Sequence, residues 1–454
     1  MARLWRSRRC RALTRVNRHG QSAGFTRHLL PRGPLGRGWA CAQTGIVHDQ
    51  RFQRPRAALA EDLPVGTRAP ATPAAAPGWV RGPAWDLAWT LNALWLAPLL
   101  LVLARGHDDL RYSGVDSLFF LLAVPLWFGH RFSSAWLAYA TPGFRPLLRT
   151  QRTRFVVVPA VIAVACFAVL LAPLRWWPMP VAERVVWLTV VDYLFVSWHF
   201  AAQHFGLLSL YRSRAGRAAD ATTRRLDRWF ALIVGGGVVV VADGLSGSIA
   251  VQERWITPLL GSFGTELVQR ALHDGGIAVV LVLTVRVLWN EFRSASPSWP
   301  RVGYVVGIAA MVLIGLLARD PFLFIVIWSV QHWTAAMGLA SLAASGGGHV
   351  PQTRFHRLLA PINRRPWAVL LVLAVISVLS LPILEVEAVG DEWVYADRIY
   401  GQLAWWLRTA PFLPVLLALG FATGFIHYVL DRAVFRFASP EVREAGRGLL
   451  RPRG

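Results

Sequence analysis

Apolar runs of about 20 residues recur along most of the chain, and short polar stretches separate them. A helix needs about that many apolar residues to cross the hydrocarbon core of a bilayer. The pattern therefore predicts an all-α fold, a polytopic transmembrane helix bundle of about ten spans. These spans are 84–104, 116–140, 155–173, 183–212, 229–249, 276–291, 302–318, 321–344, 367–384 and 411–432.

The charged residues between the runs alternate in kind. Loops after even-numbered spans carry arginine clusters, such as Arg145, Arg149 and Arg152, whereas loops after odd-numbered spans are acidic or mixed. Arginine-rich short loops stay in the cytoplasm, so the alternation predicts both termini there. We expect an integral, multi-pass protein of a bacterial inner membrane. In the outer loop 385–410, a helical apolar spacing predicts an interfacial helix that either caps a cavity or only connects two spans.

Composition agrees with the apolar pattern and changes the picture at the two ends. The chain of 454 residues is 55% hydrophobic, has a mean hydropathy of +0.42 and carries a net charge of +23. Residues 1–80 hold 14 Arg against 3 acids, a balance of +11, and have no lasting apolar period. We predict a disordered Arg-rich tail at 1–80, a transmembrane domain at 81–440 and a short basic tail at 441–454. Because the remaining charge lies mostly in membrane loops, no nucleic-acid partner is expected. Protein partners are not predicted.

One apolar run, 192–212, carries an unusual set of polar residues. At 100° per residue, Asp192, His199, Gln203 and Gly206 share one helix face, while His204 points about 140° away from His199. Polar groups at membrane depth are costly and commonly mark a functional site. This stripe is expected to face a buried site.

Other histidines lie inside the predicted spans: His130 in the second, His332 in the eighth and His427 in the tenth. With His199, they occupy even-numbered spans, which run in the same direction, and their predicted depths overlap. The pattern therefore predicts that His130, His199, His332 and His427 converge and bind a metal ion. The three cysteines form no CxxC pair, so a thiolate site is not expected.

Four further residues are candidates for supporting roles or as alternative ligands: Asp192, Gln203, His204 and Asp431. Asp431 follows His427 by four residues and shares its face, so it either binds the metal or accepts the proton of the second imidazole nitrogen. Imidazole with carboxylate suits iron, copper or zinc, and iron is the usual metal for oxygen chemistry. A lipid-embedded site would take a lipid-soluble small molecule from the bilayer.

Three other interpretations stay open. A single membrane histidine is often only a helix–helix hydrogen bond. The histidines and carboxylates could form the proton or substrate relay of a transporter. Two of the histidines could also be axial ligands of a b-type haem.

Two short patterns carry a family resemblance. The chain resembles a poorly characterised family of polytopic bacterial membrane proteins with the patterns WHxxxQxxG (Trp198, His199, Gln203, Gly206) and HYxxDxxxxR (His427, Tyr428, Asp431, Arg436). The scattered histidines have a looser similarity to the Brp/Blh carotenoid dioxygenases, which hold iron with histidines from several membrane helices. The histidine set predicts a metal-dependent, most readily iron-dependent, oxidoreductase, either an oxygenase or a desaturase-like enzyme. The HxxxH boxes of membrane fatty-acid desaturases are absent.

Overall fold

The computed structural model describes residues 78–105, 114–172, 179–217, 220–237, 257–318, 321–346, 350–385, 395–409 and 412–450. All of these residues belong to one compact unit, 74–454. Every regular element in them is a helix, as the sequence predicts. The predicted tail 1–80 lies outside the described residues as far as residue 77.

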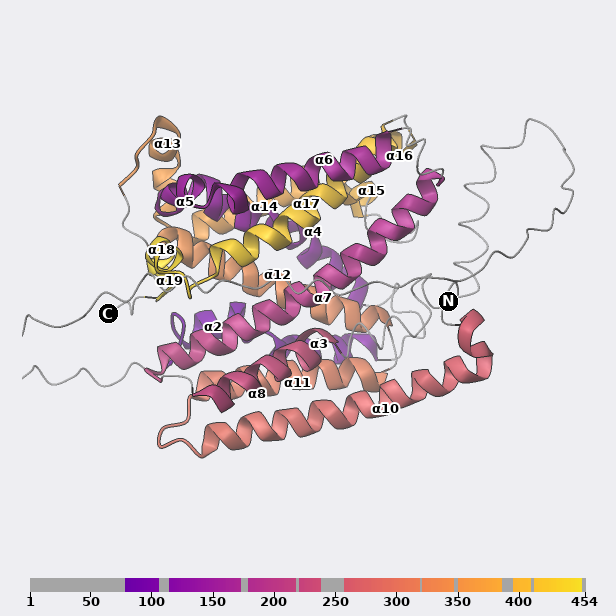
Figure 1. The fold of residues 1–454 in the computed structure, drawn as a ribbon, viewed down its shortest axis with the longest axis vertical. Coiled ribbons are helices and arrows are strands. Elements are labelled where there is room, and N and C mark those ends of the chain that lie inside the picture. The colour runs from indigo at the N-terminus through magenta and orange to yellow at the C-terminus, as the bar shows by residue number, and fades with distance from the viewer. Residues whose placement is uncertain are drawn as a thin grey trace, which may run out of the picture. The chain divides into compact units, whose positions relative to one another are not determined.

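The helices differ in length and in regularity. Long α-helices make up the bundle, and short α-, 3₁₀- and π-helical segments (the last two labelled η) join or extend them (Figure 1). In chain order they are α2 (Pro83–Trp89), α3 (Ala93–Ala104), α4 (Gly114–Ala135), η2 (Trp136–Ala140), η3 (Pro142–Phe144), α5 (Arg145–Thr150), η4 (Thr153–Val157), α6 (Val158–Leu171), α7 (Val181–Arg214), α8 (Ala221–Leu232), η5 (Ile233–Gly237), α10 (Thr257–Phe292), α11 (Trp299–Ala318), α12 (Pro321–Ser345), α13 (Arg354–Asn363), α14 (Pro366–Leu384), α15 (Tyr395–Tyr400), α16 (Gln402–Thr409), α17 (Leu413–Val434), α18 (Pro440–Ala445) and α19 (Arg447–Leu450).

Eight helical segments in the described residues are long and apolar enough to cross a membrane, and a ninth is possible if the bent pair α2–α3 forms one span. The two helices of that pair meet at 50°. These nine segments match nine of the ten predicted spans. The remaining one, 229–249, begins in α8 and η5 and leaves the described residues after 237. The chain is thus consistent with an integral multi-pass membrane protein, while the count of ten and the side of the termini stay predictions.

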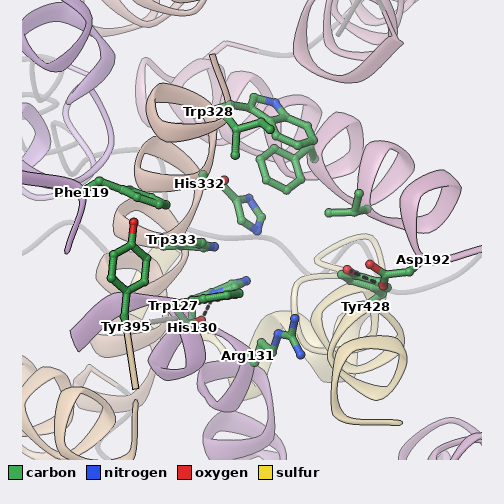
Figure 2. A pocket seen from close by; sticks show the side chains of 14 residues that line it. Phe119, Trp127, His130, Arg131, Asp192, Trp328, His332, Trp333, Tyr395 and Tyr428 are labelled. Carbon is green, nitrogen blue, oxygen red and sulfur yellow. Dashed lines mark hydrogen bonds between the residues drawn. The ribbon is translucent and has the colours of Figure 1, made fainter. Parts of the chain in front are cut away.

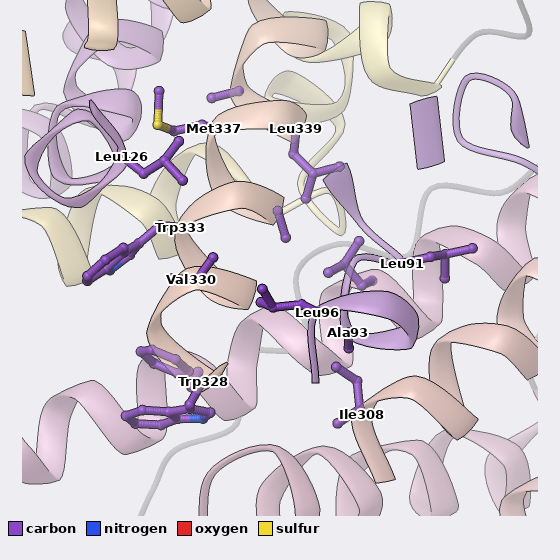
Figure 3. Close-up of a cluster of buried hydrophobic side chains, with 14 of the residues drawn as sticks. Leu91, Ala93, Leu96, Leu126, Ile308, Trp328, Val330, Trp333, Met337 and Leu339 are labelled. Atoms are coloured by element: carbon purple, nitrogen blue, oxygen red, sulfur yellow. The ribbon is translucent and has the colours of Figure 1, made fainter. Parts of the chain in front are cut away.

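Helix α12 lies at the centre of the bundle. In its apolar window 89% of residues are buried, against 22% for α7. Small residues such as Ala335, Ala340 and Ala343 let the neighbouring helices approach closely. Figure 3 shows Leu126 of α4 and Leu96 of α3 on two sides of it, with Ile308 of α11 next to Ala93 of α3. A side chain at the middle of α12 is therefore enclosed by protein.

The α4 helix is held against α14 next to His130. At Gly129 an added Cβ would lie 2.9 Å from the Leu373 carbonyl oxygen, so only glycine permits this approach. One turn earlier, the Ser377 hydroxyl of α14 bridges a backbone N–H group and a backbone carbonyl oxygen of α4. Its Oγ accepts from the Phe128 N–H at 3.1 Å and donates to the Val124 carbonyl at 2.6 Å. These contacts fix the position of α4 against α14, and with it the place of His130 in the bundle.

The arginine-rich ends of α7, α8, α10 and α11 are joined by buried ion pairs. Asp227 pairs with Arg212 and Arg301, and Glu291 pairs with Arg301 and Arg217. Each of the four carboxylate oxygens accepts from a guanidinium nitrogen. We call these five residues the charge network.

The loop after α14 forms two helices in place of the single predicted one. They are separated by Gly401, whose φ of 51° lies in the left-handed region that favours glycine. Burial raises the pKa of the Tyr395 hydroxyl, which stays protonated and donates to Asp116 of α4 at 3.4 Å. Arg398 pairs with the same carboxylate at 3.0 Å. These contacts attach α15 to the N-terminal end of α4.

The predicted short basic tail 441–454 is described as far as residue 450. There α18 and α19 bury Val442, Ala445 and Leu449. The Arg214 side chain of α7 donates to the Leu449 carbonyl. The apolar spacing within this short segment is sufficient to hold it on the bundle as far as Leu450.

Candidate metal centre

The structure brings four histidines from four helices into one buried cluster. His130 comes from α4, His199 from α7, His332 from α12 and His427 from α17, and none is more than 5% exposed. Ring centroids are 4.8 Å apart for His199–His332, His199–His427 and His130–His427, and 5.1 Å apart for His130–His332. The rings thus form a closed circuit of four, which we call the four-histidine cluster.

The ring nitrogens of the cluster point at one another. His199 Nε2 lies 3.1 Å from His332 Nε2 and 3.2 Å from His427 Nε2. Ring nitrogens of His130, His332 and His427 all lie within 4.8 Å of one another. Nitrogens of His130, His332 and His427 thus form one group that could hold an ion, and His199 Nε2 adjoins two of these three rings.

The outward nitrogens of three rings face other partners. His130 Nδ1 contacts the Trp127 carbonyl oxygen, which can only accept a hydrogen bond. His427 Nδ1 lies 3.0 Å from Ser134 Oγ, and His199 Nδ1 lies 3.8 Å from Asp431 Oδ2. A proton held at Nδ1 leaves the lone pair on Nε2, the arrangement usual for metal-binding histidine.

Asp431 lies beside a different histidine from the one its spacing suggested. Of the two roles predicted for it, metal ligand or proton acceptor for His427, the second would place its carboxylate next to His427. Its carboxylate instead lies beside His199 of α7, while Ser134 of α4 occupies the outer side of His427. The helix face that His427 and Asp431 share lies against two neighbouring helices, α4 and α7. The Nδ1 atom of His427 therefore faces α4, whereas the Asp431 carboxylate faces α7.

The other three supporting candidates are separate from the four rings. Asp192 accepts a hydrogen bond from the Tyr428 hydroxyl at 3.0 Å. The Oε1 atom of Gln203 is buried and has no partner in the described residues. His204 faces away, as its angle predicts: its Nδ1 lies 2.6 Å from the Tyr304 hydroxyl, and its ring packs on Gly235, where an added Cβ would approach within 2.4 Å.

A cavity of about 240 Å³ adjoins the cluster. His130 and His332 are in its wall, and most of the remaining wall is aromatic. Figure 2 shows Phe119 and Tyr395 at one end, and Asp192 with Tyr428 at the other. Because Tyr395 belongs to α15, the loop after α14 closes one end of this cavity.

Several residues around the four-histidine cluster and its cavity were not predicted from the sequence. Ser134 lies four residues after His130 on the same face of α4, and that spacing could have identified it. Tyr395 and Arg131 also line the cavity, but nothing in the local sequence distinguishes them from other interfacial residues. Phe200 stacks on His332 with ring centroids 3.8 Å apart. Its position directly after His199 gave no sign of this contact.

Comparisons with known proteins are negative. No protein-family model, no curated protein and no solved structure matches the chain.

Proposed function

We propose that the chain is a membrane-embedded metal protein in which the four-histidine cluster holds one transition-metal ion. We further propose that it acts as an oxidoreductase on a lipid-soluble small molecule. The single observation that carries the proposal is the position of His199 Nε2, which faces the Nε2 atoms of both His332 and His427 at hydrogen-bond distance.

Neutral imidazoles cannot satisfy this arrangement by hydrogen bonding alone. Each ring nitrogen offers either one N–H donor or one lone pair. His199 Nε2 can therefore form a hydrogen bond with only one of the Nε2 atoms of His332 and His427. The remaining Nε2 atom faces it without a complementary donor or acceptor. Buried polar groups without partners are costly. A cation among the Nε2 atoms would use every lone pair at once.

The spacing of the nitrogens supports one ion held by neighbouring ligands. Imidazole nitrogen lies about 2.0–2.1 Å from a bound metal. Nitrogens 3.1–3.2 Å apart would then subtend an angle of about 100° at the ion, between octahedral and tetrahedral values. Axial ligands on opposite sides of a haem iron would be about 4 Å apart at the same bond length. The spacing therefore favours a non-haem ion over a b-type haem.

The donor set favours iron, with copper and zinc as alternatives. Within the described part of the chain no cysteine accompanies the four imidazoles, and the Asp431 carboxylate lies close to His199. Bound iron with an open position supplies redox chemistry with oxygen. In this proposal the chain's own residues hold and orient the ion. The aromatic wall of the cavity excludes water and admits an apolar substrate.

The test is the metal content of the purified full-length protein and of three variants. His199→Ala and His332→Ala should each lose most of the bound metal, because each removes a central nitrogen. His204→Ala is the matched control, since His204 is also buried on α7 but pairs with Tyr304, and it should keep the metal. An optical spectrum of the same samples should lack haem bands. Retention of metal in both cluster variants, or a metal-free unmodified protein under every loading condition, would overturn the proposal.

A further inference from the structure

We infer that the cavity receives the end of a lipid whose flat, unsaturated ring carries a hydroxyl group, with the apolar tail left in the bilayer. This inference rests on the proposed function and narrows its substrate class.

The cavity is too small for a whole isoprenoid or acyl chain. A dry cavity of about 150 Å³ accepts one benzene ring. By proportion, the 240 Å³ beside the cluster has room for roughly ten non-hydrogen atoms. That is one substituted ring or a short chain end. The rest of any longer molecule must remain outside.

The walls are made of stacked aromatic rings. Phe119, Trp333 and Trp127 form one stack, with interplanar angles of 18° and 14° between successive rings. Trp328, Phe200 and His332 form a second, with angles of 23° and 20°. Aromatic faces make favourable stacking contacts with other flat π systems. A ring is therefore a better occupant than a saturated chain end.

The open end lies between α7 and α12. Ile325 of α12 is 40% exposed, and Asp192 and Val196 of α7 are partly exposed, whereas Tyr395 at the opposite end is 2% exposed. At this opening the exposed Ile325 side chain presents an apolar surface. In a membrane such a surface faces lipid, so the cavity would be entered sideways from the bilayer.

A carboxylate and a phenol stand at this opening. Asp192 accepts the Tyr428 hydroxyl at 3.0 Å, and a carboxylate has about four acceptor sites, so it can accept a further hydroxyl donor. Asp192 precedes His199 by two helical turns on the same face, roughly 10 Å along α7. A hydroxyl held at Asp192 thus leaves the far side of its ring close to the histidines. A phenol-type hydroxyl satisfies this acceptor, whereas an ether or a carbonyl at the same position offers no donor.

The test compares two probes that differ only in the donor. A ring-brominated phenol with a long alkyl tail, and its methyl ether, are titrated into the full-length protein in lipid nanodiscs. Bromine quenches the fluorescence of nearby tryptophans, three of which line the cavity. We expect the phenol to bind roughly 10- to 100-fold more tightly than the ether, the range for a hydrogen bond to a charged group. Equal binding of the two probes would overturn the inference.

Variants locate the preference at Asp192. In Asp192→Ala the phenol-to-ether ratio should fall to about one, and in Asp192→Asn it should be intermediate. Ser197→Ala is the control on the same helix, because its hydroxyl bonds to the Tyr193 carbonyl and is not in the cavity wall, and it should keep the full ratio. An unchanged ratio in Asp192→Ala would place the preference elsewhere and reject the site. Metal measured in the same samples separates the two proposals: metal without a phenol preference overturns only this inference, and a phenol preference without metal overturns only the metal centre.

Discussion

The bundle contains two buried polar regions that are built on opposite principles. The charge network at the arginine-rich end sets three guanidinium groups against two carboxylates, and every carboxylate oxygen accepts from an arginine. The four-histidine cluster sets like groups against one another, with nitrogens of three rings meeting at 3.1–3.2 Å. Both regions are almost completely enclosed, so water cannot make up for a missing partner in either.

The difference supports the proposal that one region is structural and the other holds a ligand. In the charge network opposite charges pair and join four helices, although Arg301 Nε and Arg217 Nε have no partner in the described residues. Imidazoles facing one another do not complete each other, and His332 Nδ1 and Asp431 Oδ1 also lack partners in the described residues. Burial alone does not identify a functional polar site. The contact of like groups in the four-histidine cluster is what supports the proposed ligand there.

The largest expected effect comes from breaking the charge network. Asp227→Ala removes the carboxylate shared by Arg212 and Arg301 and leaves buried positive charge uncompensated. Removing one partner of a buried pair costs about 3–5 kcal/mol, so the variant should unfold at a clearly lower temperature or fail to accumulate. Metal bound per folded molecule should not change. A variant that melts normally but loses its metal would contradict the separation of the two regions.

Removing the metal should have a smaller effect, confined to the cluster. A ligand at 100 times its dissociation constant stabilises the folded state by about 2.7 kcal/mol. A chelator should therefore lower the melting temperature of the unmodified protein by a few degrees, and should leave His199→Ala unaffected because that variant holds little metal. Melting curves with and without chelator provide the measurement. An equal chelator effect on both proteins would show that the stabilising ion binds elsewhere.

The smallest effect should come from the groups behind the ligands. Asp431→Asn and Ser134→Ala change the partners of His199 and His427, and each should weaken metal binding about 10- to 100-fold without abolishing it. Gln203→Ala is the comparison, because Gln203 was expected in the same role from its helix face but makes no observed contact with the four rings. Competition with a metal-binding dye measures all three. A complete loss of metal in Asp431→Asn would make Asp431 a ligand; a loss in Gln203→Ala would place that side chain at the site.

The low polarity of a membrane interior explains why the sequence alone could identify the histidines of the candidate site. Because a polar side chain at membrane depth is costly, five histidines inside apolar runs stand out without any structure. Span length sets the depth of each residue, and loop charge predicts the direction of each span. Depth and direction together were sufficient to group His130, His199, His332 and His427, and the angle along one helix was sufficient to separate His204.

Only the tertiary structure decided which helices are neighbours and how each is rotated. Local sequence records the angle between two side chains on one helix, but not which other helix lies opposite each of them. For that reason Asp431 was assigned to His427 when it lies beside His199, and Ser134 was overlooked although it faces His427. The same reason applies to the cavity, to its closure by Tyr395 and to the pairing of Asp192 with Tyr428, none of which was predicted from the sequence. Each joins residues from different helices, and packing between helices sets those distances.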